Sequence, residues 1–142
     1  MPIILVKKLV SEAIIPKYHL DGDAGMDLHA IGPRYWYITK GQTEIISTGI
    51  ALDIPYGYFG SIRERSGLAA KGIRIGGGVV DSGYRGEIKV VITNLSDMSF
   101  RIAQGDRIAQ LVIHELPVVQ IKEVSELSES NRGKAGFGSS GC

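Results

Sequence analysis

A carboxylate and a phenol lie three residues apart in a glycine-rich stretch, Gly78–Asn94, with the sequence GVVDSGYRGEIKVVITN. The neighbouring glycines would let a ligand lie directly against the backbone near Asp81 and Tyr84. Ser82-Gly83 is typical of a turn, and apolar residues alternate along Ile88–Thr93 as in a strand. The stretch therefore predicts a β-hairpin with a ligand site at its base. A hairpin with nothing more than a polar tip fits these residues equally well.

Two other stretches combine glycine with a cation and a hydroxyl: Arg65-Ser66-Gly67, and RGKAGFGSSG at Arg132–Gly141. Exposed N–H groups, a hydroxyl and a guanidinium are what phosphate oxygens require. Each stretch alone is more often a solvated turn. A P-loop at Gly133-Lys134 is rejected, because Ala135 stands where Ser or Thr is required and no strand precedes it.

The sequence offers little for a metal site built by the protein alone. His19, His29 and His114 lack the spacing of metal ligands, and the single cysteine, Cys142, makes a structural zinc site unexpected. Three carboxylates stand beside glycines, those of Asp27, Asp81 and Asp106. One or two carboxylates beside a phosphate-rich ligand suggest Mg²⁺, held mostly by the phosphates and by water.

The elements that position these residues are expected to be short strands, because 19 glycines interrupt a chain of 142 residues. The sequence predicts an all-β jelly roll or distorted barrel, with one helical turn at Leu68–Lys71. The expected strands are Ile3–Leu9, Tyr35–Thr39, Glu44–Ile54, Tyr58–Arg63, Gly86–Asn94, Ser99–Ile102, Arg107–Glu115 and Val118–Val124. Residues 1–124 would form one β-core, and the polar, glycine-rich residues 125–142 a mobile C-terminal arm.

Charge and composition narrow the class of protein. Sixteen Lys and Arg balance 15 Asp and Glu, which argues against a general nucleic-acid or membrane binder. The chain contains no apolar run long enough to span a membrane and no secretory signal. A single cysteine excludes an intrachain disulfide. We expect a soluble, intracellular protein of one domain, in the cytoplasm or nucleus and of cellular or viral origin.

Five segments, taken together and in this order, resemble the five motifs of the trimeric dUTPase family, the deoxyuridine triphosphate nucleotidohydrolases. They are AGMDLHA at Ala24–Ala30, RSGLAAKG at Arg65–Gly72, the Gly78–Asn94 stretch, GDRIAQLVIHE at Gly105–Glu115, and Arg132–Gly141. The resemblance implies a jelly-roll homotrimer with active sites shared between subunits. It also implies Mg²⁺-assisted hydrolysis of dUTP to dUMP and pyrophosphate, which keeps uracil out of DNA and supplies dUMP for thymidylate synthesis.

The same resemblance implies a role for each matching residue. Asp81 would be the general base that activates the attacking water, with Gln110 near that water and the phosphates. Tyr84 would pack under the deoxyribose and exclude a 2′-hydroxyl. Asp27 would bind waters of the Mg²⁺ shell. The remaining substrate contacts would come from Arg65, Ser66 and Gly67 at the phosphates, from Gly78, Val79, Val80 and Lys89 at the uracil edge, and from Arg132, Phe137, Gly138, Ser139 and Ser140 in the closing arm.

The sequence departs from the family pattern at three positions. Glu64 precedes Arg65 where proline is common, Ala135 replaces an arm glycine, and Met26 replaces an aromatic residue. Strand alternation predicts that Glu64 points away from the face of Arg65 and has no consequence. Three alternatives stay open: a dCTP deaminase of the same fold, a dUTP-sensing regulator without turnover, and a jelly-roll lectin or coat module.

Overall fold

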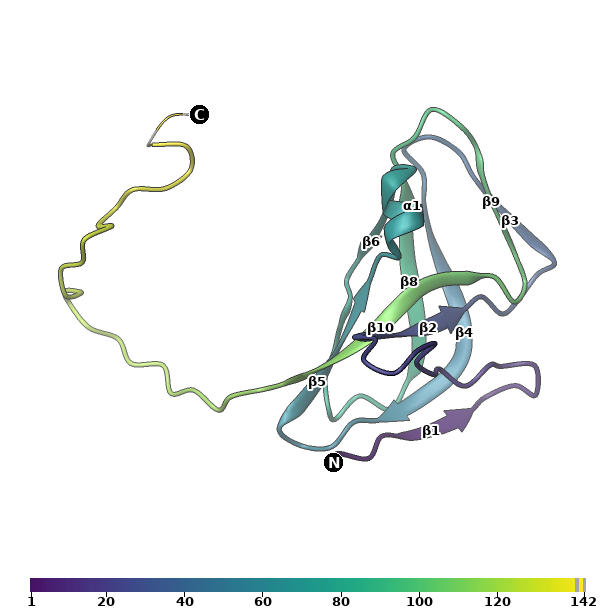
Figure 1. Ribbon diagram of the computed structural model, residues 1–142, viewed down its shortest axis with the longest axis horizontal. Helices are drawn as coiled ribbons and strands as arrows, with labels where there is room; N and C mark the ends of the chain where they lie inside the picture. Colours follow the sequence, from purple (N-terminus) through teal and green to yellow (C-terminus); the bar gives the residue numbers. More distant parts are fainter. Residues whose placement is uncertain (140, 142) are drawn as a thin grey trace.

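The computed structural model describes residues 1–139 and 141. Two four-stranded antiparallel sheets and a two-stranded ribbon make up the body (Figure 1). The first sheet has the order β1-β4-β8-β6, the second β2-β10-β5-β7, and β3 pairs with β9. Bounds are β1 Leu5–Lys8, β2 Gly25–His29, β3 Tyr35–Ile38, β4 Thr43–Asp53, β5 Tyr58–Arg63, β6 Ile73–Gly76, β7 Val79–Val80, β8 Glu87–Asn94, β9 Phe100–Ala103 and β10 Arg107–Glu115.

Both sheets face one common core of buried aliphatic side chains. Ile88, Val90 and Ile92 of β8 point inward, and the residues between them are more exposed, as the alternating sequence predicts. Leu28 of β2 and Leu111 of β10 reach the same core from the second sheet. The predicted all-β, jelly-roll class is confirmed, and the predicted helical turn is α1, Ser66–Ala70.

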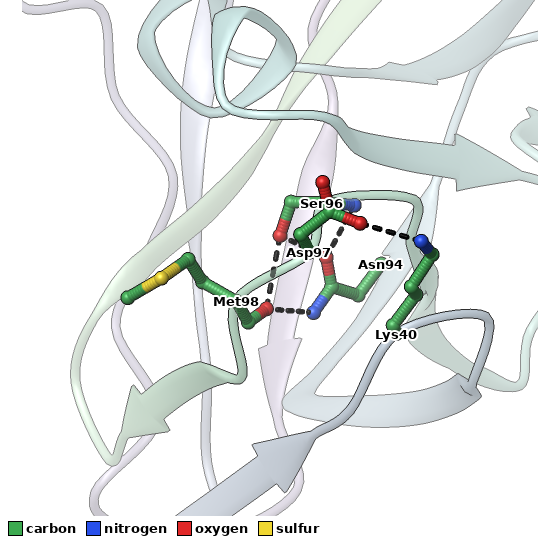
Figure 2. Close-up of polar contacts among 5 residues, drawn as sticks. All are labelled: Lys40, Asn94, Ser96, Asp97 and Met98. Carbon is green, nitrogen blue, oxygen red and sulfur yellow. Dashed lines mark hydrogen bonds and ion pairs between the residues drawn. The ribbon is translucent and has the colours of Figure 1, made fainter.

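One buried polar residue secures the end of β8 where it meets the ribbon. The Asn94 side-chain amide donates to the carbonyls of Ile38 and Met98, at 2.8 Å each. Its oxygen accepts hydrogen bonds from the backbone N–H and the hydroxyl of Ser96 (Figure 2). Every hydrogen-bonding atom of this fully buried amide is therefore used, which removes the cost of burying it.

The predicted hairpin in Gly78–Asn94 is wrong. β7 pairs with β5 in the second sheet, whereas β8 pairs with β4 and β6 in the first. Ile62 donates to the carbonyl of Gly78 at 2.7 Å, which draws the chain to the edge of the second sheet. Residues 81–86 therefore cross from one sheet to the other. Sequence alternation detects a strand but cannot identify the strand that pairs with it.

The expected strand at Val118–Val124 is not formed. After β10 the chain leaves the body as an extended segment, and none of its described residues belongs to a helix or strand (Figure 1). Its apolar side chains are exposed, among them Val118, Ile121 and Leu127. The sequence also missed β2 and β6, which are only five and four residues long. In the described part of the chain no helix is long and apolar enough to cross a membrane.

Candidate active site in two pockets

A pocket of about 200 Å³ opens between β7 and β8, the two strands that do not pair with each other. Its walls include predicted base- and sugar-binding residues from both sheets. Those present are Val79, Val80, Asp81, Tyr84 and Lys89, beside Ile62, Gly77, Glu87 and Ile88. Among the described strands β7 pairs with β5 alone, so its other edge has no strand partner. The failure of the hairpin to close is what creates the space.

Gly78 lies beside this pocket and holds its wall in place. Its carbonyl accepts the N–H of Ile62, and a Cβ at Gly78 would collide with the Ile62 carbonyl oxygen. The close approach of β7 to β5 therefore requires glycine here.

Asp81 and Tyr84 lie next to each other at the rim of this pocket. The N–H of Tyr84 donates to the Asp81 carbonyl at 3.1 Å, which closes the turn between them. The Tyr84 hydroxyl donates to the carbonyl of Glu87 at 2.9 Å, so the ring folds back over its own loop. The Asp81 side chain is exposed, and no hydrogen bond or ion pair within residues 1–139 occupies its carboxylate. That carboxylate is therefore accessible to a ligand or to water.

A second pocket, of about 340 Å³, gathers the predicted phosphate and metal residues. Gln110 of β10 lies opposite Asp27 of β2 and Arg63 of β5, so one strand brings three separate motifs together. The α1 turn begins directly after β5 and adds its first residues to the same wall. The lining comprises His19, Asp23, Ala24, Gly25, Asp27, Arg65, Ser66, Gly67, Arg107 and Gln110.

Gln110 is held by its neighbours in this pocket. Its side-chain N–H donates to the Glu64 carbonyl at 2.8 Å. A Cβ on Gly25 would lie 2.9 Å from Cδ of Gln110 and closer still to its Oε1. Glycine at position 25 therefore leaves the space that the glutamine occupies.

Two arginines converge on Asp27. The Arg65 Nε lies 3.0 Å from one carboxylate oxygen, and the Arg107 Nη1 lies 3.5 Å from the other. The pKa of His29 is lowered, first by burial and then by the positive charges of Arg107 and Arg65, against the opposing effect of Asp27. Two guanidinium groups thus line this pocket beside the carboxylates of Asp23 and Asp27, and guanidinium groups can bind the oxygens of a phosphate.

Arg107 and His19 are pocket residues that the sequence alone did not identify. The triplet Gly105-Asp106-Arg107 was noted only for its carboxylate. Asp106 instead accepts the N–H of Ala103 at 2.8 Å, as a turn residue does, while Arg107 faces the pocket. In the sequence, the position of Arg107 directly after a turn in a β-rich chain was the feature that could have indicated a pocket residue.

Glu64 has a partner, contrary to the expectation that it would be inconsequential. Its Oε1 accepts the N–H of Ile75 at 3.2 Å, which ties the end of β5 to β6. Hydrogen bonds from its own backbone and from Ile75 lower its pKa. The half-buried side chain thus bonds to a neighbouring strand.

The predicted arm residues do not reach either pocket within one chain. Phe137 is fully exposed, and Arg132 donates locally to the carbonyl of Ala135 at 2.9 Å. Gly138 and Ser139 belong to the segment after β10, whose yellow end lies apart from the body (Figure 1). Phe137 has a positive φ of 51°, whereas Ala135 does not have a positive φ, so alanine is unstrained here. Ser140 lies outside the described residues.

Within residues 1–139 and 141, the two pockets have no lining residue in common. The first carries the carboxylate of Asp81 and the ring of Tyr84. The second carries two arginines, two aspartates, two glycines and a serine. The second pocket has the guanidinium groups and the hydroxyl that phosphate oxygens require.

Comparison with known proteins identifies the family. The dUTPase family model matches residues 11–141, and the chain belongs to that family. It is 45% identical over 141 residues to the deoxyuridine 5′-triphosphate nucleotidohydrolase of Clostridium kluyveri, covering 97% of each chain. Identity to the Nautilia profundicola protein of that name is 48% over 139 residues, covering 96% of each.

Solved structures agree with this assignment. The dUTPase of Staphylococcus bacteriophage 80alpha with dUPNHPP has a TM-score of 0.89 and 32% identity, covering 99% of both chains. A mutant dUTPase from phage phi11 of S. aureus, which reveals the coordination of a structural Mg(II) ion, has a TM-score of 0.79 at 26% identity. That match covers 87% of this chain and 97% of the other.

Proposed function

We propose that this chain hydrolyses dUTP to dUMP and pyrophosphate. The observation that carries the proposal is the division of the predicted residues between two pockets, one suited to a base and sugar and one to phosphates. Membership of the dUTPase family supports the same substrate. The uracil edge would meet the backbone of Gly78, Val79 and Val80, and a facing segment near Lys89. Cytosine reverses uracil's donor and acceptor pattern, and each buried group left unpaired costs ~1–3 kcal/mol.

In this mechanism Asp81 acts as the general base. Its carboxylate takes a proton from water as the water oxygen bonds to the α-phosphorus. The bond from that phosphorus to the oxygen bridging to the β-phosphate breaks, and pyrophosphate leaves with the electron pair. Arg65, Ser66 and Gly67 hold the phosphates, and Gln110 orients the water beside them. Proton transfer to a positioned base contributes on the order of 10²–10⁴-fold.

The residues present fit a Mg²⁺ ion that is bound mainly by substrate. Within residues 1–139 and 141 no three acidic, histidine or cysteine side chains cluster to hold a metal. Two carboxylates line the phosphate pocket, those of Asp23 and Asp27, and Asp27 is already paired with two arginines. Such a donor set suits an ion with several retained waters, to which Asp27 would hydrogen-bond. When bound, the ion neutralises charge on the triphosphate.

The complete site would form between chains of a homotrimer. Two observations support this: the pockets share no residue, and the segment that carries Arg132 and Phe137 runs away from its own body. We propose that residues 125–142 act as a mobile arm. It would close over a site on another subunit, with Phe137 stacked on uracil and with Arg132, Gly138, Ser139 and Ser140 at the γ-phosphate. Stacking contributes ~1–3 kcal/mol and helps offset the entropy lost on ordering the arm.

The test is pyrophosphate release from dUTP, dCTP, dTTP and UTP, each with and without Mg²⁺. We expect dUTP with Mg²⁺ to be the only good substrate. Release of ammonia from dCTP would indicate a deaminase instead, and dUTP binding without any turnover would indicate a sensor. Comparable release from dUTP and UTP would contradict the assigned role of Tyr84.

A further inference from the structure

The Tyr84 ring lies across Gly86. Its hydroxyl reaches the carbonyl of Glu87, three residues along the chain, at 2.9 Å, so the phenol folds back over the residues between them. A Cβ on Gly86 would lie 2.6 Å from Cζ and 2.9 Å from Cε2 of that ring, and closer still to Oη. All three nearest atoms belong to Tyr84, so a methyl group and the ring cannot both occupy this space.

The backbone at Gly86 does not itself require glycine. Its φ is not in the positive range that disfavours other residues. Alanine would therefore be compatible with the local chain and incompatible only with the observed position of the ring. This separates Gly86 from turn glycines such as Gly77, whose φ is +57°.

The hydrogen-bond acceptor cannot move to follow the ring. Glu87 pairs with Ala51 of β4, and its carboxylate accepts the N–H of Gly49 at 3.0 Å and the hydroxyl of Ser47 at 3.5 Å. These contacts sit at the register shift in β4 between Ser47 and Ala51. Since these contacts with β4 fix the position of Glu87, a methyl group at position 86 would push the Tyr84 hydroxyl away from the Glu87 carbonyl.

We propose that Gly86 is a positioning residue for sugar selectivity. By leaving the space beneath the phenol, it keeps Tyr84 in the wall of the first pocket, where the ring excludes a 2′-hydroxyl. This inference rests on the proposed dUTP hydrolysis. Gly86, which has no side chain, would thereby contribute to the discrimination between deoxyribose and ribose.

The test compares Gly86→Ala with Gly83→Ala. Gly83 lies in the same loop, has nothing within 4 Å of an added Cβ and has no positive φ. For Gly86→Ala we expect the ratio of kcat/KM for dUTP over UTP to fall on the order of ten- to a hundredfold, the scale of discrimination by one substituent in a pocket. The ratio for Gly83→Ala should stay at the wild-type value. A Gly86→Ala ratio within threefold of wild type overturns the inference.

A double substitution shows whether the effect passes through the ring. In a Tyr84→Ala background, Gly86→Ala should leave the dUTP-to-UTP ratio unchanged, because no ring remains to displace. A further fall in that background overturns the inference. If Gly86→Ala turns over too slowly to assay, the ratio of Kd values for the imido analogues of dUTP and UTP is the readout, with the same criterion. If the wild-type protein does not hydrolyse dUTP, the proposed function is contradicted. If the wild-type protein prefers dUTP over UTP and Gly86→Ala has the same preference, only this inference is contradicted.

Discussion

At the scale of single residues, we assign the activation of water to the exposed carboxylate of Asp81. Asp81→Asn keeps the size of the side chain and its place in the pocket wall but removes the negative charge. We expect dUTP to bind with little change in Kd while kcat falls ~10²–10⁴-fold. Calorimetric titration with the dUTP imido analogue, beside steady-state kinetics, separates the two effects. Undiminished turnover would remove Asp81 from the proposed mechanism.

Gly25 can be tested in the same way as Gly86, because a Cβ at position 25 would occupy space that the Gln110 side chain fills. Gly25→Ala would place a methyl group within 3 Å of the Gln110 amide and displace it from the Glu64 carbonyl. We expect kcat to fall at least ~10-fold, since orientation of reacting groups is sensitive to small displacements. Gly76→Ala is the matched control, because its added methyl meets only Val91 at an ordinary 3.9 Å. Equal kcat values for the two variants would show that Gln110 tolerates displacement.

Gly25 and Gly86 serve a different purpose from the one that the sequence suggests for glycines near the site. The sequence suggested that glycines let a ligand approach bare backbone. At Gly25 and Gly86 the space is instead filled by Gln110 and Tyr84, the chain's own side chains. A glycine in a sequence signals that something lies close to it, and the structure is needed to show whether that is a ligand or another residue.

At the scale of elements, Glu64 links β5, which leads into the phosphate loop, to β6. Because hydrogen bonding lowers its pKa, the carboxylate's contribution to stability is present at neutral pH. That contribution is lost as the pH falls below about 4.3, the ordinary glutamate value, and through the folded-state pKa. We expect Glu64→Gln to have a lower Tm than wild type at pH 7 and a smaller deficit at pH 3.5.

The control for this prediction is Glu126→Gln, in the exposed segment beyond β10. It should leave Tm unchanged at both pH values. A Glu64→Gln deficit that is constant or grows on acidification would contradict the assigned hydrogen bond to Ile75. Protein concentration must be held fixed, because Tm of an oligomer depends on it.

At the scale of the whole molecule, the separation of the two pockets makes a prediction about mixed assemblies. Asp81→Asn removes a group from the first pocket, and Gln110→Ala removes one from the second. If each site combines these pockets from different chains, co-refolding the two inactive variants restores sites that hold both wild-type residues. Random mixing of equal amounts should recover about one quarter of wild-type activity.

The controls are each variant refolded alone, and the two refolded separately and then combined. Light scattering measures the mass of each assembly. Activity that stays at the level of the separate variants would place both pockets of a site on one chain. A monomeric mass would contradict the shared site altogether.

The sequence by itself determined the all-β class and most strand positions, and it supplied the candidate residues for the chemistry. Alternating apolar residues and local motifs are properties of neighbouring positions, and Ile88–Thr93 or Arg65-Ser66-Gly67 display them without any distant partner. Only the tertiary structure decided that β7 and β8 belong to different sheets, so that a pocket opens between them. It alone decided that β10 brings Asp27 and Gln110 together and that Arg107 joins them. Pairing between strands depends on hydrogen bonds and packing across long sequence separations, which no local pattern encodes.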